Sequence, residues 1–125
     1  MAFLFQSISG SVTAPLGFRA SGVYCDVKRL GTGKGSNKKV ALDLAIIASE
    51  TLGPIAGLFT TNQVCAAPVK WCLERMKEGE GQAIVVNSGN ANACTGERGK
   101  RDAATMAQST AKGLGLDPNL VFVAS

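Results

Sequence analysis

Residues 83–96 read Ala-Ile-Val-Val-Asn-Ser-Gly-Asn-Ala-Asn-Ala-Cys-Thr-Gly. The short apolar run at residues 83–86 is followed at once by small residues and amides, a pattern typical of a buried strand that ends in a loop. A plain connector needs only one or two turn-forming polar residues. This loop has five polar side chains within nine positions: Asn87, Ser88, Asn90, Asn92 and Thr95. The stretch therefore predicts a place where hydrogen-bond donors and acceptors are required.

Outward from this stretch, apolar segments alternate with turn residues. Residues 8–16 are rich in Ser, Thr, Gly and Pro, and we expect them to be irregular. The first two expected strands should pair as a long hairpin across the glycine-rich turn at residues 31–37. In chain order, the expected strands are residues 17–27, 40–49, 57–61, 82–87 and 119–125.

Two helices are expected between these strands. The first begins near Pro68, where a missing N–H costs nothing, and stops at Gly79. Its expected buried side is Val69, Cys72, Leu73 and Met76, and its other side is Glu74, Arg75 and Lys77. The second helix follows the polar loop, with Thr95 as N-cap and Glu97 in the first turn, and ends at Gly113 and Gly115. Its expected buried face is Ala103, Met106, Ala107, Thr110 and Leu114.

The predicted order β-β-β-α-β-α-β indicates an α/β fold in which helices are layered on a mixed sheet. A chain of 125 residues is one domain or part of one, so residues 1–125 are expected to form a single domain. The last strand, Leu120-Val121-Phe122-Val123, has no closing element after it. Either this strand pairs inside its own sheet, or the chain is a piece of a larger polypeptide.

The residue composition limits the kinds of catalytic and metal site that this chain can form. The chain has no histidine and four cysteines, Cys25, Cys65, Cys72 and Cys94. Ser–His and Cys–His pairs are therefore excluded within this chain, and a zinc site would need all four thiolates at an unusual spacing. We expect free thiols, no metal, no resident cofactor and a cytoplasmic location. The apolar runs are far shorter than the ~20 residues of a membrane span, so no membrane segment is expected.

The net charge of +4 comes from two basic patches. They are Lys34, Lys38 and Lys39 in the glycine-rich loop, and Arg98, Lys100 and Arg101 after the polar loop. Solvated loops and an anionic partner are both open readings. The Gly31-x-Gly33-x-Gly35 pattern lacks the spacing of a phosphate loop, and no aromatic residue lies within the lysine patch, so nucleic-acid binding is not expected.

Residues 83–96 resemble the signature of the ornithine acetyltransferase family, the glutamate N-acetyltransferases of arginine biosynthesis called ArgJ. The resemblance covers the chain from residue 11 onward, and the asparagine-rich stretch is long and specific. Other stretches that resemble the family, in the same order, are residues 12–23, 42–47, 57–62, 66–69 and 120–125.

This resemblance implies a precursor that cuts itself into an α chain and a β chain. The first residue of the β chain, a threonine, is the nucleophile that takes acetyl from N-acetylornithine and passes it to glutamate; some members also use acetyl-CoA. The terminal amine of that threonine can act as its base, which suits a chain without histidine. The implied fold is a layered α/β arrangement similar to that of DmpA-type aminopeptidases, with α and β chains intertwined in an α2β2 heterotetramer.

In the family, a Thr-Gly pair that forms the oxyanion hole directly follows the strand that here ends in Val123-Ala124-Ser125. The chain therefore resembles the N-terminal part of an α chain, completed by further chain or a β subunit and inactive alone. No catalytic residue is expected within it. The pair Thr95-Gly96 has the same residue types as the oxyanion pair, but it belongs to the asparagine-rich stretch, so the oxyanion role is not assigned to it.

The polar loop is expected to line the substrate pocket or to brace the residues that do. Amides can donate or accept hydrogen bonds without bringing charge, and the helix that follows favours a negative group at its N-terminus. The candidate residues are Asn87, Ser88, Gly89, Asn90, Asn92, Cys94 and Thr95. Two alternatives stay open: a related self-processed hydrolase with an N-terminal threonine, and a non-catalytic binding fragment that uses the basic loops.

Overall fold

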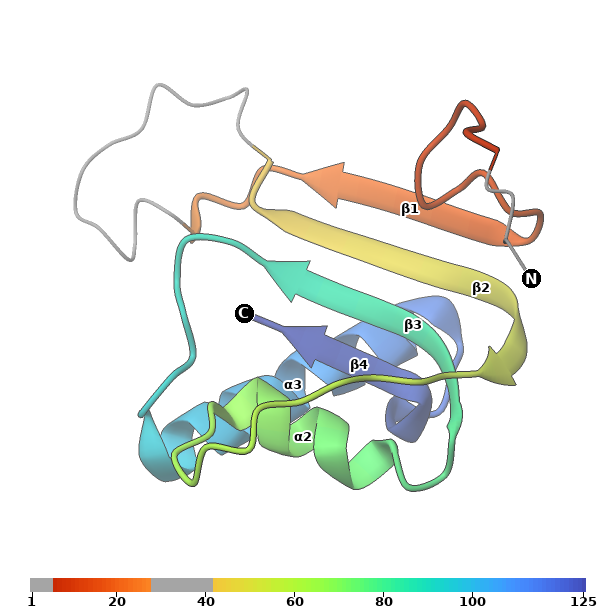
Figure 1. Ribbon diagram of the computed structural model, residues 1–125. Coiled ribbons are helices and arrows are strands. Elements are labelled where there is room, and N and C mark those ends of the chain that lie inside the picture. Colours follow the sequence, from red (N-terminus) through yellow and green to blue (C-terminus); the bar gives the residue numbers. More distant parts are fainter. Residues whose placement is uncertain (1–5, 28–41) are drawn as a thin grey trace.

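The computed structural model describes residues 6–27 and 42–125. Four strands form one sheet in the order β1-β2-β3-β4, with two helices packed on it (Figure 1). The strands are β1 (Phe18–Val23), β2 (Leu44–Pro54), β3 (Glu80–Asn87) and β4 (Val121–Ala124). The connecting helices are α2 (Ala67–Arg75), α3 (Gly96–Leu114) and a 3-10 turn at Pro118–Leu120. This mixed sheet with packed helices is the α/β architecture that the sequence predicts.

The predicted hairpin between the first two strands is confirmed. β1 and β2 pair antiparallel from Phe18 opposite Ser49 to Val23 opposite Leu44. Both strands differ from their expected bounds, because β1 ends at Val23 and β2 runs on to Pro54. The early end of β1 precedes Asp26, whose φ of 61° lies in the left-handed region and cannot continue a strand. The expected turn at residues 31–37 lies outside the described residues.

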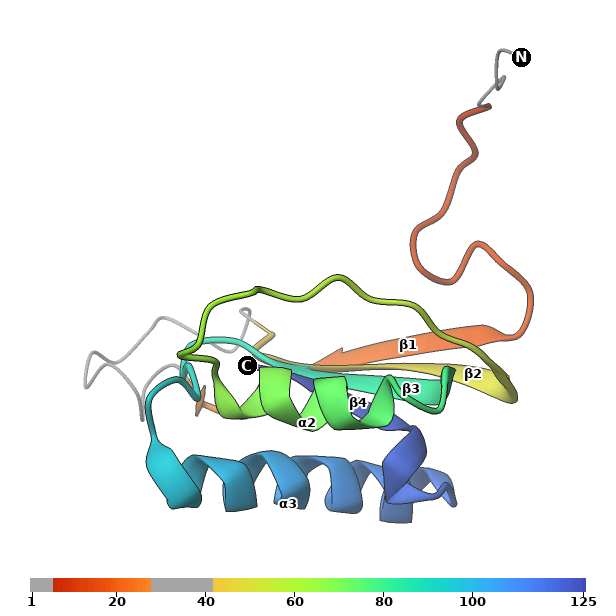
Figure 2. The same ribbon diagram turned by 60° about the horizontal axis from the view of Figure 1, so that its bottom comes forward.

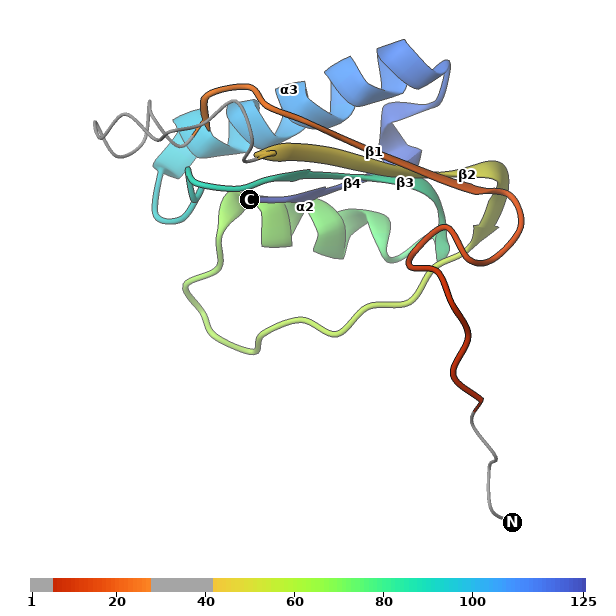
Figure 3. The same ribbon diagram turned by 90° about the horizontal axis from the view of Figure 1, so that it is seen from above.

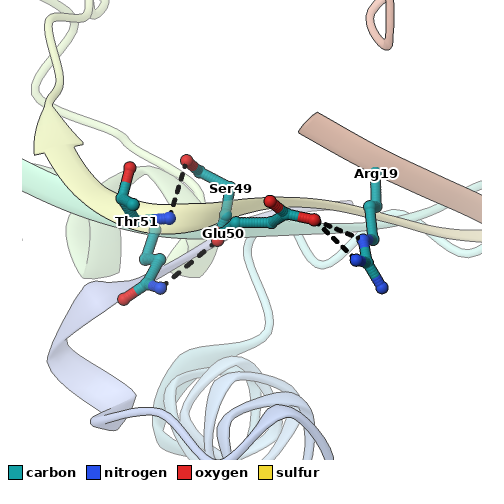
Figure 4. Close-up of polar contacts among 5 residues, drawn as sticks. Arg19, Ser49, Glu50 and Thr51 are labelled. Atoms are coloured by element: carbon teal, nitrogen blue, oxygen red, sulfur yellow. Dashed lines mark hydrogen bonds and ion pairs between the residues drawn. The ribbon is translucent and has the colours of Figure 1, made fainter. Parts of the chain in front are cut away.

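The second half of β2 is irregular. Its pairing with β3 shifts register between Ala48 and Gly53, and within this bulge the Thr51 N–H donates to Ser49 Oγ at 3.3 Å. The Gln82 side chain of β3 donates to the Ser49 carbonyl oxygen at 3.2 Å, and Arg19 of β1 binds Glu50 at 2.6 Å (Figure 4). Side chains from both neighbouring strands therefore hold the bulged region, which lets β2 continue beyond the predicted end.

α3 packs on one face of the sheet and carries the core (Figure 3). β3 and β4 are parallel, with Ala83 opposite Val121, and α3 is the crossover between them. The predicted buried face is confirmed for Ala103, Ala107 and Thr110, whereas Leu114 is 41% exposed. Core residues on α3 and the two strands are Ala83, Val85, Ala107, Ala111, Val121 and Val123. Ala111 is buried in place of Leu114, and the helix ends after Leu114 in a left-handed cap at Gly115.

α2 lies alongside β4 at the edge of the sheet (Figure 2). Pro68 is in its first turn, as predicted, but the helix ends at Arg75, before Gly79. The expected buried side is confirmed at Cys72, is only half-buried at Val69 and Met76, and was wrong at Leu73, which is 39% exposed. The reason is that α2 faces a strand edge, where polar groups need hydrogen bonds, so apolar periodicity identifies its inner side only in part.

The strand expected at residues 57–61 is absent, and that prediction was wrong. Residues 55–66 form an irregular segment on the side of the sheet opposite α3, and Leu58 is fully exposed (Figure 3). A strand needs a neighbour with free backbone groups. Both edges of β2 and of β3 are taken by strands, and the outer edge of β4 is taken by α2. The outer edge of β1 has no neighbouring strand, but residues 55–66 run from β2 to α2, away from β1, and so do not pair with it (Figure 1).

Candidate functional site

The candidate site lies at the edge of the sheet where β3 and β4 both end. Because the two strands are parallel and Val86 pairs with Ala124, Asn87 and Ser125 emerge side by side. Figure 1 shows the two strand ends next to each other, with the loop to α3 leaving β3 there. The carboxyl ends of parallel strands are the usual ligand-binding edge of an α/β sheet. The polar loop after β3, called the asparagine-rich loop below (residues 87–95), is therefore at the position where α/β proteins commonly bind their ligands.

Asn87 joins this loop to the end of β4. Its Nδ2 donates a hydrogen bond to the carbonyl oxygen of Asn90 at 3.0 Å, and its Oδ1 accepts one from the hydroxyl of Ser125. The Ser125 hydroxyl also lies 3.2 Å from the Asn90 carbonyl oxygen. Both ends of the Asn87 amide are thus engaged within the chain, so Asn87 braces the loop against β4.

Asn92 closes the other end of the loop onto α3. Its Nδ2 donates to the carbonyl oxygen of Gly99 at 2.7 Å, and its Oδ1 accepts from the hydroxyl of Thr95. Thr95 is the N-cap residue, as predicted, but its hydroxyl bonds Asn92 and caps no backbone N–H of the helix. Gly99 is buried, and a Cβ there would collide with Thr95 Oγ1 and Asn92 Oδ1. This close approach explains the glycine in the first turn of α3.

Asn90 differs from the two bracing asparagines. Its side chain is exposed, and its amide makes no hydrogen bond to the residues that the structure describes. Its backbone is nevertheless fixed, because its carbonyl oxygen accepts from Asn87 and Ser125. A side-chain amide on a fixed backbone is available to a ligand without a large ordering cost.

Asp43 is a site residue that the sequence reasoning missed. Its carboxylate is buried and accepts hydrogen bonds from the backbone N–H groups of Cys25 at 2.6 Å and Val27 at 2.8 Å. Its carbonyl oxygen accepts from the N–H of Ser88 at 2.9 Å. Asp43 therefore ties the start of the asparagine-rich loop to the segment after β1. The available signal was an acidic residue between Leu42 and Leu44, within the strand expected at residues 40–49.

A cavity of about 560 Å³ opens beside the loop, a size that suits a small-molecule ligand. Four of the predicted residues line it: Asn87, Asn90, Asn92 and Thr95. The further lining residues, which were not predicted, include Val27, Leu44, Arg98, Asp102, Met106 and Ser125. The structure therefore brings together amides, one carboxylate and one guanidinium around a single hollow.

The charged groups near the cavity are paired. Arg98 Nε lies 3.7 Å from Asp102 Oδ2 one helical turn later, with both side chains largely exposed. Lys100 Nζ lies 2.5 Å from Glu97 Oε1; this hydrogen bond lowers the pKa of Glu97 below its ordinary value and raises that of Lys100. Two of the three cations in the predicted basic patch at residues 98–101 thus have anionic partners, which weakens the reading of that patch as an anion-binding surface. The lysine patch at residues 34–39 lies outside the described residues.

Ser88, Gly89 and Cys94 do not line the larger cavity. Cys94 has a φ of 56° and lines a separate hollow of about 250 Å³ together with Cys65, Lys70 and Lys100. All four cysteines are free thiols. Gly89, with a φ of 103°, serves the turn between Ser88 and Asn90, a conformation that glycine adopts readily.

The described residues contain no cluster of three or more His, Cys, Asp or Glu that could hold a metal ion. Within the same ranges no helix is long and apolar enough to cross a membrane. The cavity supplies uncharged donors and acceptors, the Ser125 hydroxyl and one ion pair. Such an arrangement can bind and orient a small polar molecule.

Comparison with known proteins identifies relatives along nearly the whole chain. An arginine biosynthesis bifunctional protein ArgJ from Symbiobacterium thermophilum is 52% identical over 118 residues, which cover 94% of this chain and 28% of that protein. Its counterpart from Bacillus subtilis is 42% identical over 119 residues, with 94% and 27% covered. The chain thus spans less than a third of the length of these two relatives.

Two solved structures share the fold. The ArgJ structure from Bacillus halodurans superposes with a TM-score of 0.80 at 40% identity, covering 92% of this chain and 56% of that one. An ornithine acetyltransferase from Mycobacterium tuberculosis, solved in complex with ornithine, gives 0.77 at 38% identity, with 91% and 58% covered. The model of the ArgJ family matches residues 19–125. With this match over most of its length, the chain belongs to the ArgJ family.

Proposed function

We propose that this chain is the N-terminal part of an acetyltransferase of arginine biosynthesis, which moves acetyl from N-acetylornithine to glutamate. The observation that carries the proposal is the family match over residues 19–125, which includes the whole asparagine-rich loop beside the larger cavity. The Mycobacterium tuberculosis relative, named as an ornithine acetyltransferase with bound ornithine, supports the substrate class. Because the chain spans 28% of its Symbiobacterium relative, the activity belongs to the whole protein.

The proposed chemistry runs through a threonine that lies outside this chain. Its hydroxyl oxygen attacks the acetyl carbonyl of N-acetylornithine, the amide C–N bond breaks, and ornithine leaves with the proton of that hydroxyl. The amine of glutamate then attacks the resulting ester, which releases N-acetylglutamate and restores the threonine hydroxyl. Acetyl-CoA is a second proposed acetyl donor, through the same ester. No redox step and no resident cofactor are needed.

The proposed role of this chain is to form one wall of the substrate pocket. The free amide of Asn90 would hydrogen-bond the amide or carboxylate of an amino-acid substrate, while Asn87 and Asn92 hold the loop in shape. Arg98 and Asp102 line the same cavity but pair with each other, so the proposal assigns the contact with the substrate to Asn90 and not to this ion pair. We propose a β chain from the same precursor as the partner, in an α2β2 assembly in the cytoplasm.

The test is the intact mass of every polypeptide in the purified whole protein, together with an assay of acetyl transfer from N-acetylornithine to glutamate. A second polypeptide that begins with threonine, plus transfer activity, is the expected result. Release of acetate without N-acetylglutamate would instead support the related self-processed hydrolase. Salt-dependent binding of an anionic polymer without either reaction would support the binding fragment.

The role of Asn90 is tested by Asn90→Ala in the whole protein. We expect transfer to fall about tenfold, in line with the loss of one hydrogen bond to the substrate, with no change in thermal stability. Ser88→Ala is the matched control, because Ser88 is exposed in the same loop and does not line the cavity. Equal kinetics for the two variants would exclude Asn90 from substrate binding.

A further inference from the structure

The outer edge of β4 has backbone groups that its partner strand cannot satisfy. β4 pairs with β3 on one side only. Successive residues of a strand direct their backbone N–H and C=O groups to opposite sides of the strand. The backbone groups of Phe122 point toward β3, so those of Val121 and Val123 point away from β3. Within residues 6–27 and 42–125 no strand lies on that side. An edge of this kind needs other hydrogen-bond partners.

Two neighbouring side chains of α2 supply those partners. Trp71 Nε1 donates to the carbonyl oxygen of Val121 at 2.9 Å. Cys72 Sγ lies 3.3 Å from the carbonyl oxygen of Val123, to which it donates, and it accepts from the N–H of Val123 at 3.4 Å. One buried thiol thus serves both backbone groups of one residue, as a strand neighbour would. Burial raises the pKa of the Cys72 thiol, which keeps the proton that this donation requires.

Arg75 fixes the tryptophan in this position. Its guanidinium carbon lies 3.0 Å from the centroid of the Trp71 ring, and its Nη1 donates to the Trp71 carbonyl oxygen at 3.1 Å. Its Nη2 reaches Asn119 Oδ1 at 3.3 Å, just before β4 begins. We call Trp71, Cys72 and Arg75 the edge clamp. Together they hold the strand from the turn before it to its penultimate residue.

The edge clamp acts close to the candidate site. Val123 is two residues before Ser125, a distance of about 7 Å along a strand. Ser125 is the residue whose hydroxyl meets Asn87 and the Asn90 carbonyl oxygen. A change in the position of β4 along its own axis would therefore separate Ser125 from the asparagine-rich loop. Apolar packing against α3 on the face of the strand has no preferred direction. The position of β4 along its axis is therefore set at its two edges, by the ladder with β3 on one side and by the edge clamp on the other.

We propose that the edge clamp is a positioning device for the reaction: Trp71, Cys72 and Arg75 set where β4 ends, and thereby where Ser125 and the asparagine-rich loop meet at the pocket. This inference rests on the proposed function. It assigns a role in activity to three residues that do not line the larger cavity. It also explains why a polar pair, and not a purely apolar helix face, lies against the strand.

The experiment uses the whole protein and three variants. Cys72→Ala removes both hydrogen bonds to Val123, Cys72→Ser keeps a donor and an acceptor at the same position, and Trp71→Phe removes only the indole N–H. Ala111→Gly is the stability-matched control, because Ala111 is buried on α3, away from the edge of β4. For each protein we would measure kcat and KM for acetyl transfer, thermal stability, and amide exchange at Val123 and Phe122.

We expect Cys72→Ala to lower kcat by about tenfold with KM changed less than about threefold, because the pocket is misplaced while the substrate groups remain. Exchange at Val123 should accelerate in this variant and that at Phe122 should not. Cys72→Ser should recover most of the activity, and Trp71→Phe should have an intermediate effect. The Ala111→Gly protein should lose stability and keep its kcat.

Equal loss of kcat in Cys72→Ala and Ala111→Gly would overturn the proposal, as would unchanged exchange at Val123. A wild-type protein without acetyl transfer would overturn the proposed function instead. In that case amide exchange at Val123 still decides whether the edge clamp holds the strand.

Discussion

The two helices beside β4 hold the same strand by different means. α3 lies on its face, where Ala107 and Ala111 pack against Val121 and Val123 with almost no exposed surface. α2 lies at its edge, where Trp71 and Cys72 form hydrogen bonds with its backbone. Burial on the face stabilises the fold in proportion to the apolar area removed from water, and it has no preferred direction. Each hydrogen bond at the edge stabilises the fold less than the buried face does, but it specifies the position of the strand along its axis.

This difference explains why the buried face of α3 was predicted more fully from the sequence than that of α2. A helix on a sheet face must present an apolar stripe, and the stripe of α3 is visible at residues 103, 107 and 110. A helix on a strand edge must present donors and acceptors. Helical periodicity placed Cys72 on the inner side of α2, but it did not indicate Trp71 or the hydrogen bonds that both side chains form. Four predictions test this contrast, in order of decreasing effect.

The largest effect is expected from Ala107→Asp, which places a carboxylate at a position with no exposed surface. An unpaired charge in this core should cost about 4 kcal/mol or more of the free energy of unfolding, enough to prevent folding of many proteins. Gln108→Asp is the control, because Gln108 is exposed on the same turn. Circular dichroism and thermal unfolding should separate the two variants clearly; a folded Ala107→Asp protein of normal stability would contradict face packing by α3.

Next is Gly99→Ala, which adds a methyl group where the loop approaches α3. The new Cβ would collide with Thr95 and Asn92, so the loop or the helix must move, at a cost of about 1–3 kcal/mol. Gly113→Ala on the same helix should have the opposite effect. A Cβ there meets nothing within 4 Å, so the substitution should raise the free energy of unfolding by up to about 1 kcal/mol. Thermal unfolding of both proteins checks the prediction, and two stabilised variants would refute the close packing at Gly99.

A smaller effect is expected at the strand edge. Trp71→Phe removes the indole N–H and leaves the carbonyl oxygen of Val121 without its partner, which should cost about 1 kcal/mol. Leu73→Ala, on the side of α2 that the sequence pattern had indicated as buried, should cost less, because Leu73 is 39% exposed. Denaturant unfolding of the two variants decides the question. A larger loss for Leu73→Ala would restore the apolar reading of α2.

The smallest effect is expected on the exposed surface of α3, at the pair Glu97 and Lys100. The hydrogen bond to Lys100 lowers the pKa of Glu97 below its ordinary 4.5, so the stabilisation is present above that pH and is lost as pH falls through the lowered pKa. The pKa of Lys100 is raised above 10.5, so its share is present below that pH and is lost as pH rises through the raised value. Within these limits Glu97→Gln should lower the melting temperature slightly.

Two conditions should remove the effect of Glu97→Gln. At about 1 M salt the pair is screened, and in strong acid the wild-type carboxylate is protonated, so both proteins should melt alike. A difference that persists in acid would show that Glu97 acts by some means other than its charge.

Much of the fold could be predicted because it depends on local pattern. The strand at residues 82–87, the loop after it and the start of α3 at Thr95 are confirmed, since apolar runs and capping residues mark such boundaries directly. The strand expected at residues 57–61 was wrong, because strand propensity does not reveal whether a free neighbour exists. The true end of β2 at Pro54 depends on a bulge held by side chains of β1 and β3.

The candidate site was predictable as a region but not residue by residue. Composition indicated that residues 87–96 gather polar groups, and four of those residues line the cavity. Composition could not show that the side-chain amides of Asn87 and Asn92 hydrogen-bond other residues of the chain. Their partners include Ser125 and Gly99, which lie outside the loop. Nor could composition assign a role to Asp43, whose partners Cys25 and Val27 lie 18 and 16 positions earlier in the chain.

The sequence by itself determined the family, the α/β class and the buried face of α3, because each is recorded in neighbouring residues or in a periodic pattern. The tertiary structure alone decided which side chains of α2 bond the edge of β4 and which asparagine remains free for a ligand. Those outcomes depend on hydrogen bonds between residues far apart in the chain, such as Trp71 with Val121, 50 positions later, and Asn87 with Ser125, 38 positions later. The physical reason is that a hydrogen bond forms only when folding brings donor and acceptor within about 3 Å, and no local pattern encodes that meeting.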